Sequence, residues 1–158
     1  MYNPESSRIE EQVVVFSLHD QVYGINIESV LEIIKMESVT RVPGTPDFIE
    51  GVINLRGKVI PVMDLCKRFN MPSSEVSAST RVIIVEAGGV TVGMVVDAVS
   101  EVLRFPSSSI EPPPPLIVGA SIEALKGIAL VDGQLIILLD LGKVLYDEEK
   151  QKLQEIGR

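Results

Sequence analysis

The chain has 158 residues, 46% of them hydrophobic, and its 14 basic and 22 acidic residues give a net charge of -8. A chain of this length can bury roughly 70% of its unfolded surface, which is enough for one domain or two fused small ones. The acidic balance argues against a nucleic-acid backbone as the main partner, because phosphate binding needs a basic face.

The first residues lack the basic and apolar regions of a signal peptide, and residues 1–11 are expected to form a flexible N-terminus. The lone Cys66 cannot form an internal disulfide. No apolar run approaches the roughly 18 residues that a membrane span needs. We therefore expect a reducing, cytoplasmic setting.

Most of the chain predicts β-strands. The predicted strands are short, rich in Val and Ile and separated by turn residues. In chain order they cover 13–18, 21–25, 52–55, 59–63, 82–86, 90–96, 127–131 and 135–139. Residues 27–36 combine helical and alternating spacing of apolar side chains, which predicts one helical turn running into a strand. Short strands at this spacing favour small barrels or a sandwich.

The chain contains an internal repeat. Residues 51–65 match 127–141 at a shift of 76 residues, and residues 13–35 match 82–104 at a shift of 69. Two copies indicate a duplicated small domain, because an open solenoid generally needs three or more units. The extra residues of the second copy fall in the window that holds the Pro112–Pro115 run. We interpret this run as a stiff spacer, with a ligand for a proline-binding module as the alternative.

Residues that both copies share are interpreted as demands of the fold. Asp64 and Asp140 each close a strand before a short segment, where a carboxylate can accept backbone N–H bonds. Helix capping is therefore favoured over catalysis at both positions. Asn54, Arg56 and Pro61 occur in the first copy only, and such departures are the better candidates for partner contact.

Catalytic and metal-binding sites are not predicted. The only histidine, His19, falls in a predicted hairpin turn, and Cys66 has no histidine candidate near it. The glycine-rich segments lack the Lys-Ser or Lys-Thr step of a phosphate loop, and Cys and His do not occur at zinc-type spacing. We expect no catalytic residue, no cofactor and no metal.

The chain resembles the CheW-like domain family over about residues 12–146. The resemblance is carried by Tyr23-Gly-Ile-Asn-Ile27, by residues 30–34 and 40–43, by the Asn54-Leu-Arg-Gly57 motif with its flanks over 48–65, and by residues 95–103 and 135–141. It implies a mainly β fold, in which two SH3-like five-stranded β-barrel subdomains related by internal duplication share an apolar core and carry short helical segments. Copy 1 would cover about 12–69, a linker 70–80 and copy 2 about 81–146, followed by a tail or short helix at 147–158.

The resemblance also implies a function without catalysis. Members of this family are scaffolds that bind the regulatory domain of the histidine kinase CheA and the cytoplasmic signalling tip of methyl-accepting chemoreceptors. A cytoplasmic protein recruited to membrane-associated receptor arrays is expected, with no nucleic acid and no membrane insertion. The alternatives are an adaptor for a different chemosensory-type kinase pathway and a small-ligand-binding β-barrel protein, which would need convergent polar groups in a pocket.

Aliphatic side chains are the candidates for receptor contact, because a helical tip docks in a groove lined with such residues. Val30, Ile33, Val99 and Val102 stand at equivalent positions of the two copies and are predicted to flank their junction. We expect some of them to contact the receptor and the others to remain in the core. The alternative, that all four are core, is equally favoured, because exposed patches this apolar are unusual without a partner.

Arg56 is the charged candidate. Its fork of donors suits a carboxylate, either Glu32 within the chain or an acid on a partner, and an exposed turn arginine is the alternative. Pro61 removes one N–H donor from its strand, which predicts a sheet edge or a bulge. Because edges can be used for contact between barrels of different proteins, this part of the first copy is predicted to face the kinase domain.

Overall fold

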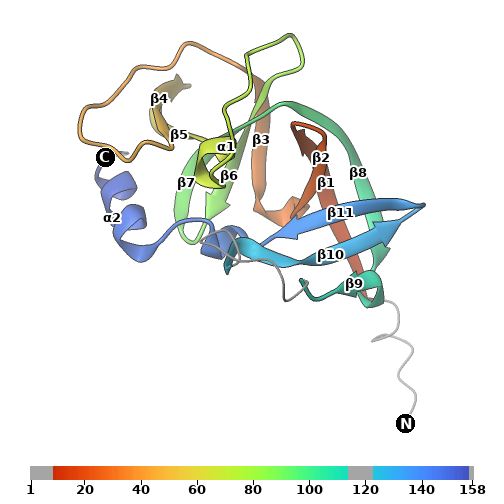
Figure 1. Ribbon diagram of the computed structural model, residues 1–158. Coiled ribbons are helices and arrows are strands. Elements are labelled where there is room, and N and C mark those ends of the chain that lie inside the picture. The colour runs from red at the N-terminus through yellow and green to blue at the C-terminus, as the bar shows by residue number, and fades with distance from the viewer. Residues whose placement is uncertain (1–8, 114–122, 157–158) are drawn as a thin grey trace.

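The computed structural model describes residues 9–113 and 123–156, which form two β-sheets and short helices (Figure 1). One sheet has the strand order β8-β1-β2-β11-β10-β9, and the other has the order β3-β6-β7-β5-β4. The strands are β1 (Glu10–Leu18), β2 (Gln21–Asn26), β3 (Val30–Lys35), β4 (Ile49–Leu55), β5 (Lys58–Asp64), β6 (Arg81–Ala87), β7 (Val90–Val96), β8 (Ala98–Pro106), β9 (Ile110–Glu111), β10 (Leu125–Val131) and β11 (Gln134–Leu139).

Each sheet takes strands from both copies of the repeat. In the six-stranded sheet β1 and β2 come from the first copy, and in the five-stranded sheet β6 and β7 come from the second. The two exchanges use equivalent parallel pairings, β11 with β2 and β5 with β7. The fold is thus mainly β with two subdomains, as expected from the internal duplication, and the subdomains are interlocked. We call the six-stranded one subdomain A and the five-stranded one subdomain B.

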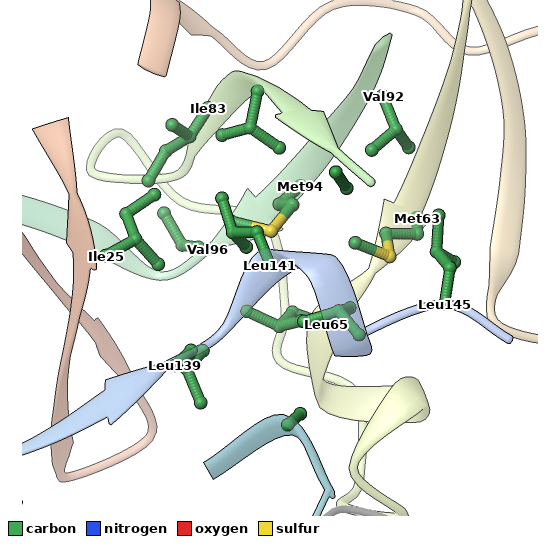
Figure 2. Close-up of a cluster of buried hydrophobic side chains, with 14 of the residues drawn as sticks. Ile25, Met63, Leu65, Ile83, Val92, Met94, Val96, Leu139, Leu141 and Leu145 are labelled. Atoms are coloured by element: carbon green, nitrogen blue, oxygen red, sulfur yellow. The ribbon is translucent and has the colours of Figure 1, made fainter. Parts of the chain in front are cut away.

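The core consists of a central cluster and one smaller cluster in each subdomain. Along β1, Val13 and Val15 belong to the cluster of subdomain A, whereas Val14 and Phe16 belong to the central cluster. The strand β6 alternates in the same way between the central cluster and that of subdomain B. Burial on both faces explains why these strands read as nearly continuous apolar runs. Figure 2 shows part of the central cluster, including Ile25, Met63, Leu65, Ile83, Met94, Leu139 and Leu141.

Short helices follow the last strand of each copy, and an aspartate caps each of them. The first is α1 (Leu65–Arg68), where Asp64 Oδ1 accepts hydrogen bonds from the N–H of Cys66 at 2.9 Å and of Lys67 at 3.4 Å. The second is the 3-10 helix η5 (Leu141–Lys143), where Asp140 Oδ1 accepts from the Gly142 N–H at 2.9 Å. The capping interpretation of both aspartates is confirmed.

The expected strands are all present, and 27–36 begins with the 3-10 helix η2 (Ile27–Ser29) before β3. The strand β8, the 3-10 helix η3 (Ser107–Ser109) and the two-residue β9 were not predicted. The strand β8 is a poorly buried edge strand, so its pattern is weak, although the repeat with residues 30–35 pointed to it.

The chain ends differ in part from expectation. The strand β1 starts at Glu10, inside the segment 1–11 that was predicted to be flexible, and residues 1–8 lie outside the described residues. The segment 147–158 contains the helix α2 (Asp147–Ile156), one of its two expected forms. The Pro112–Pro115 spacer lies partly outside the described residues.

Candidate functional site

The turn between β4 and β5 presents Arg56 at the end of subdomain B. Arg56 and Gly57 have φ angles of 50° and 85°, and the pair Leu55 and Lys58 closes a two-residue turn. Positive φ at both central positions is the requirement of a type I′ hairpin turn. Asn54 Oδ1 accepts a hydrogen bond from the Gly57 N–H at 2.8 Å and so stabilises the turn.

Arg56 forms a forked ion pair with Glu32 on β3, the strand at the other edge of the five-stranded sheet. Its Nη1 donates to Oε1 at 3.1 Å and its Nη2 donates to Oε2. The hydrogen bond raises the pKa of the Arg56 guanidinium above its ordinary value. The Arg56 side chain is 73% exposed and that of Glu32 is 29% exposed. Exposed ion pairs contribute little to stability. A carboxylate of another protein can therefore approach Arg56 at a low cost in folding free energy.

The ion pair borders a cleft of about 1020 Å³ at the end of subdomain B. Its lining includes Leu31, Glu32, Arg56, Val59 and Pro61, together with the β6–β7 turn and the helix α2. Leu31 and Val59 are 56% and 45% exposed. The cleft therefore combines a charged pair with uncovered aliphatic surface, and we call it the Arg56 cleft.

A β-bulge explains the exposure of Leu31, which the sequence did not single out as a site residue. Val30 pairs with Val85 and Glu32 with Ile84, so that Leu31 is the extra residue. A bulge of this kind re-aims a side chain. The second copy has the same bulge at Ser100, whose hydroxyl donates to the Val15 carbonyl oxygen at 3.2 Å. In the sequence, Leu31 could have been found by comparing the copies, because a large apolar residue stands where the second copy has Ser100.

The four aliphatic candidates separate into two kinds. Val30 and Val99 are partly buried and pack against the central cluster. Ile33 and Val102, on the edge strands β3 and β8, are 40% and 48% exposed. Their cross-strand partners belong to the central cluster, so both lie on the side of the sheet that faces it. We call Ile33 and Val102 the edge aliphatics; neither lines the Arg56 cleft.

Pro61 does not lie on an edge strand, so that expectation is wrong. The strand β5 lies between β4 and β7 in the five-stranded sheet. Pairing with β7 starts only at Val62, one residue after the proline. At Pro61 itself, β5 is therefore paired with β4 but not with β7. The proline lines the cleft at this position.

The groups that could carry other chemistry have structural roles. His19 is an exposed turn residue with φ 54°, and its Nε2 lies 2.7 Å from the Pro72 carbonyl oxygen. Cys66 is buried, and burial raises the pKa of its thiol. Within residues 9–113 and 123–156, no three His, Cys, Asp or Glu residues are grouped so that they could hold a metal ion. No helix of that same part is long and apolar enough to cross a membrane.

Comparison with known proteins agrees with this architecture. The family model described as "CheW-like domain" matches residues 12–149. The chemotaxis protein CheW of Klebsiella aerogenes is 36% identical over 150 residues, covering 95% of this chain and 90% of that protein. The CheW of Bacillus subtilis is 36% identical over 141 residues, with 89% and 90% covered. The crystal structure of the scaffolding protein TtCheW from Thermoanaerobacter tengcongensis has 44% sequence identity and a TM-score of 0.82, covering 90% of this chain and 97% of that one.

Proposed function

The chain belongs to the CheW family and is a chemotaxis scaffold protein, and from that premise we propose that it couples chemoreceptors to the histidine kinase CheA without catalysing a reaction. It binds the regulatory domain of the kinase and the cytoplasmic signalling tip of the receptor, and it works in the cytoplasm at membrane-associated receptor arrays. The observation that carries the proposal is the Arg56 cleft, together with the exposed aliphatic side chains of Ile33 and Val102 outside it.

The Arg56 cleft is the surface for the kinase domain. Its Leu31 and Val59 offer aliphatic contact, and the guanidinium of Arg56 suits a carboxylate of the partner. Glu32 takes one N–H from each terminal nitrogen and holds the guanidinium in place, which leaves the other N–H groups for a carboxylate of the partner. Fixed donors lose less freedom on binding, which favours affinity.

The edge aliphatics are the surface for the receptor tip. A helical hairpin presents apolar side chains at helical spacing, and such a face docks on uncovered aliphatic groups. Ile33 and Val102 are large apolar side chains that the chain itself leaves about half exposed. Val30 and Val99 pack against the central cluster and support the same strands from within.

Calorimetric titration tests both arms of the proposal. The protein is titrated with an isolated CheA regulatory domain and, separately, with a receptor signalling-tip fragment, and we expect saturable binding to each. Replacing Ile33 and Val102 together by Asn should weaken receptor binding by roughly tenfold, because hot-spot apolar contacts carry most of the binding energy. Kinase-domain binding should stay unchanged in that variant. Absence of binding to both partners would refute the scaffold function.

A further inference from the structure

The helix α2 forms one wall of the Arg56 cleft. It lies against β5 and β7 (Figure 1), and Leu153 and Gln154 line the cleft beside Arg56. Leu153 is only 2% exposed and joins the central cluster. A helix of ten residues is not stable alone in water. The place of this wall therefore depends on the contacts that hold the helix.

Arg68 at the end of α1 makes the principal polar contacts to the start of this helix. Its Nη1 and Nη2 each lie 3.1 Å from a carboxylate oxygen of Glu149, and its Nε donates to the Val144 carbonyl oxygen at 2.7 Å. The guanidinium also lies 4.6 Å from the ring centres of both Phe48 and Tyr146. One side chain from the first copy thus engages four residues from two distant parts of the chain.

Glu149 connects this anchor to the first turn of α2. Its Oε1 accepts a hydrogen bond from the Tyr146 N–H at 2.7 Å, the reach-back contact of a capping box. The side chains of Arg68 and Glu149 are 13% and 16% exposed, whereas Arg56 in the other ion pair is 73% exposed. Shelter from water and a forked geometry both strengthen an arginine–carboxylate pair. A lysine cannot reproduce the fork or the flat contact with two rings.

Lys150 ties the same helix to η5, beside the β6–β7 turn. Its Nζ donates to the Gly142 carbonyl oxygen at 3.0 Å, and a Cβ added to Gly88 would stand 2.5 Å from that Nζ. Gly88 belongs to the β6–β7 turn, and the following residues 89–91 line the cleft. The start of the helix is therefore held by Arg68, through Glu149, and by Lys150, through Gly142 of η5.

We propose that Arg68 is a positioning residue for partner binding in the Arg56 cleft. Through Glu149 and the first turn of α2 it fixes the wall made by Leu153 and Gln154, and this wall sets the width of the cleft that the partner enters. The identity of the partner rests on the proposed function, whereas the position of the wall is a property of the chain alone.

Distance measurement between two spin labels tests the position of the wall. The labels are attached at Lys58→Cys and Gln154→Cys, two exposed residues that line the cleft, in a Cys66→Ala background without other thiols. The parent should give one narrow distance distribution, and Arg68→Ala and Arg68→Lys should both broaden it. Lys67→Ala is the matched control, because Lys67 is the adjacent cation and pairs with Glu50 at 3.0 Å. An unchanged narrow distribution in Arg68→Ala would overturn the proposal.

Affinity for the isolated CheA regulatory domain provides the second readout. At a temperature where circular dichroism shows full folding, Arg68→Ala should bind roughly tenfold more weakly, because a loosened wall must be ordered again on binding. If Arg68→Ala has a lower melting temperature but the parent's affinity and the parent's spin-label distances, Arg68 only stabilises the fold. That result would refute its role as a positioning residue. If Arg68→Ala does not fold, Glu149→Gln replaces it, since that change keeps an acceptor for Tyr146 and removes the charge that holds Arg68. If even the parent does not bind, the proposed function fails, while the distances still decide whether Arg68 fixes the wall.

Discussion

The β4–β5 and β10–β11 hairpins have the same backbone turn and opposite charges at its tip. Arg56 and Gly57 have φ angles of 50° and 85°, and Asp132 and Gly133 have 51° and 80°. A turn that forms equally well with aspartate does not require a guanidinium. The duplication therefore separates what the fold needs, a glycine in the second turn position, from what the first copy adds.

The surroundings of the two turns differ in the same sense. Glu32 pairs with Arg56 in subdomain B, but the equivalent positions of subdomain A hold two acids, Glu101 and Asp132. Next to the turns, the cross-strand pair Asn54 and Val59 corresponds to Leu130 and Leu135. Repeated backbone with divergent side chains indicates that the two hairpin surfaces meet different environments.

The segments that follow the two copies have also diverged. After α1 the chain runs without regular structure, and Ser73 Oγ donates to Asp64 Oδ2 at 2.8 Å. After η5, at the shift of 76 residues, the chain forms α2. The first segment meets the β1–β2 turn at His19, and the second meets the β6–β7 turn at Gly88, so equivalent turns are covered by different structures. The helical version supplies a wall to the Arg56 cleft.

The shared backbone of the hairpins is most easily broken at Gly51 and Gly127, where another segment crosses closely. A Cβ on Gly51 would overlap the Thr40 carbonyl oxygen, and one on Gly127 would stand 2.6 Å from that of Glu111. Gly51 also has a positive φ of 149°. We expect Gly51→Ala to lower the free energy of unfolding by about 3 kcal/mol, because steric strain of this kind cannot relax without moving the segment that crosses at Thr40.

Urea unfolding measures this loss, with Gly127→Ala expected to lose less because its φ is not positive. Gly142→Ala is the control, since its nearest neighbour is the Asp140 carboxylate at 3.2 Å. A Gly51→Ala variant as stable as the Gly142→Ala control would show that the two crossings do not shape the subdomains.

The two capping aspartates also differ between the copies, with a smaller expected effect on stability. Asp64 accepts from Cys66 N–H, Lys67 N–H and Ser73 Oγ, whereas Asp140 accepts from Gly142 N–H. Asp64→Ala should cost about 1–2 kcal/mol and Asp140→Ala about 0.5–1 kcal/mol, the range of lost helix caps. Thermal or urea unfolding of both variants measures the difference, and the Asn substitutions serve as controls that keep an acceptor. Equal losses would contradict the greater structural role of the first cap.

A still smaller difference between the copies is expected in alkaline solution. The first copy has the titratable thiol of Cys66, and the equivalent position of the second copy holds Gly142. Burial raises the pKa of the Cys66 thiol above its ordinary 9.0. The folded protein thus holds this proton more tightly than the unfolded chain, and the resulting stability is complete below the unfolded pKa and lost as pH rises through the folded one. The free energy of unfolding should decline above about pH 9, and less so in Cys66→Ala.

Urea unfolding between pH 8 and pH 11 at constant ionic strength measures both slopes. Burial also raises the pKa of Tyr23, so the variant should retain a decline of the same sign at higher pH. Identical slopes in the two proteins would exclude a contribution from the thiol.

The positions of the strands other than β8 and β9 were predictable from the sequence, and the partners of the strands were not. Alternating Val and Ile with glycine turns mark where a strand begins and ends. The pattern does not say which strand lies beside it, and the two-sided burial of β1 removes the alternation that would identify its faces. The exchange of strands between subdomains therefore required the structure.

The candidate site was predictable in part for similar reasons. Comparison of the copies singled out Arg56 and offered Glu32 as its acid, and the two residues are paired in the structure. The exposure of Leu31 depends on a bulge, and the wall formed by α2 depends on contacts between distant segments. Neither leaves a local pattern in the sequence. The edge strand expected at Pro61 was wrong because β5 lies between β4 and β7, with which it pairs from Val62 onward.

Charge reversal in each subdomain tests most directly whether the first copy carries the kinase-binding surface. Arg56→Glu and Lys126→Glu change the net charge equally, and Lys126 lies on β10 of subdomain A, paired with Glu11 at 3.5 Å. Calorimetric titration with the isolated CheA regulatory domain should show roughly tenfold weaker binding for Arg56→Glu, because an acid of the partner then meets like charge. Lys126→Glu should bind as the parent does, and both variants should keep the parent's melting temperature. Parental affinity in Arg56→Glu, or the same loss in both variants, would contradict the assignment of the Arg56 cleft.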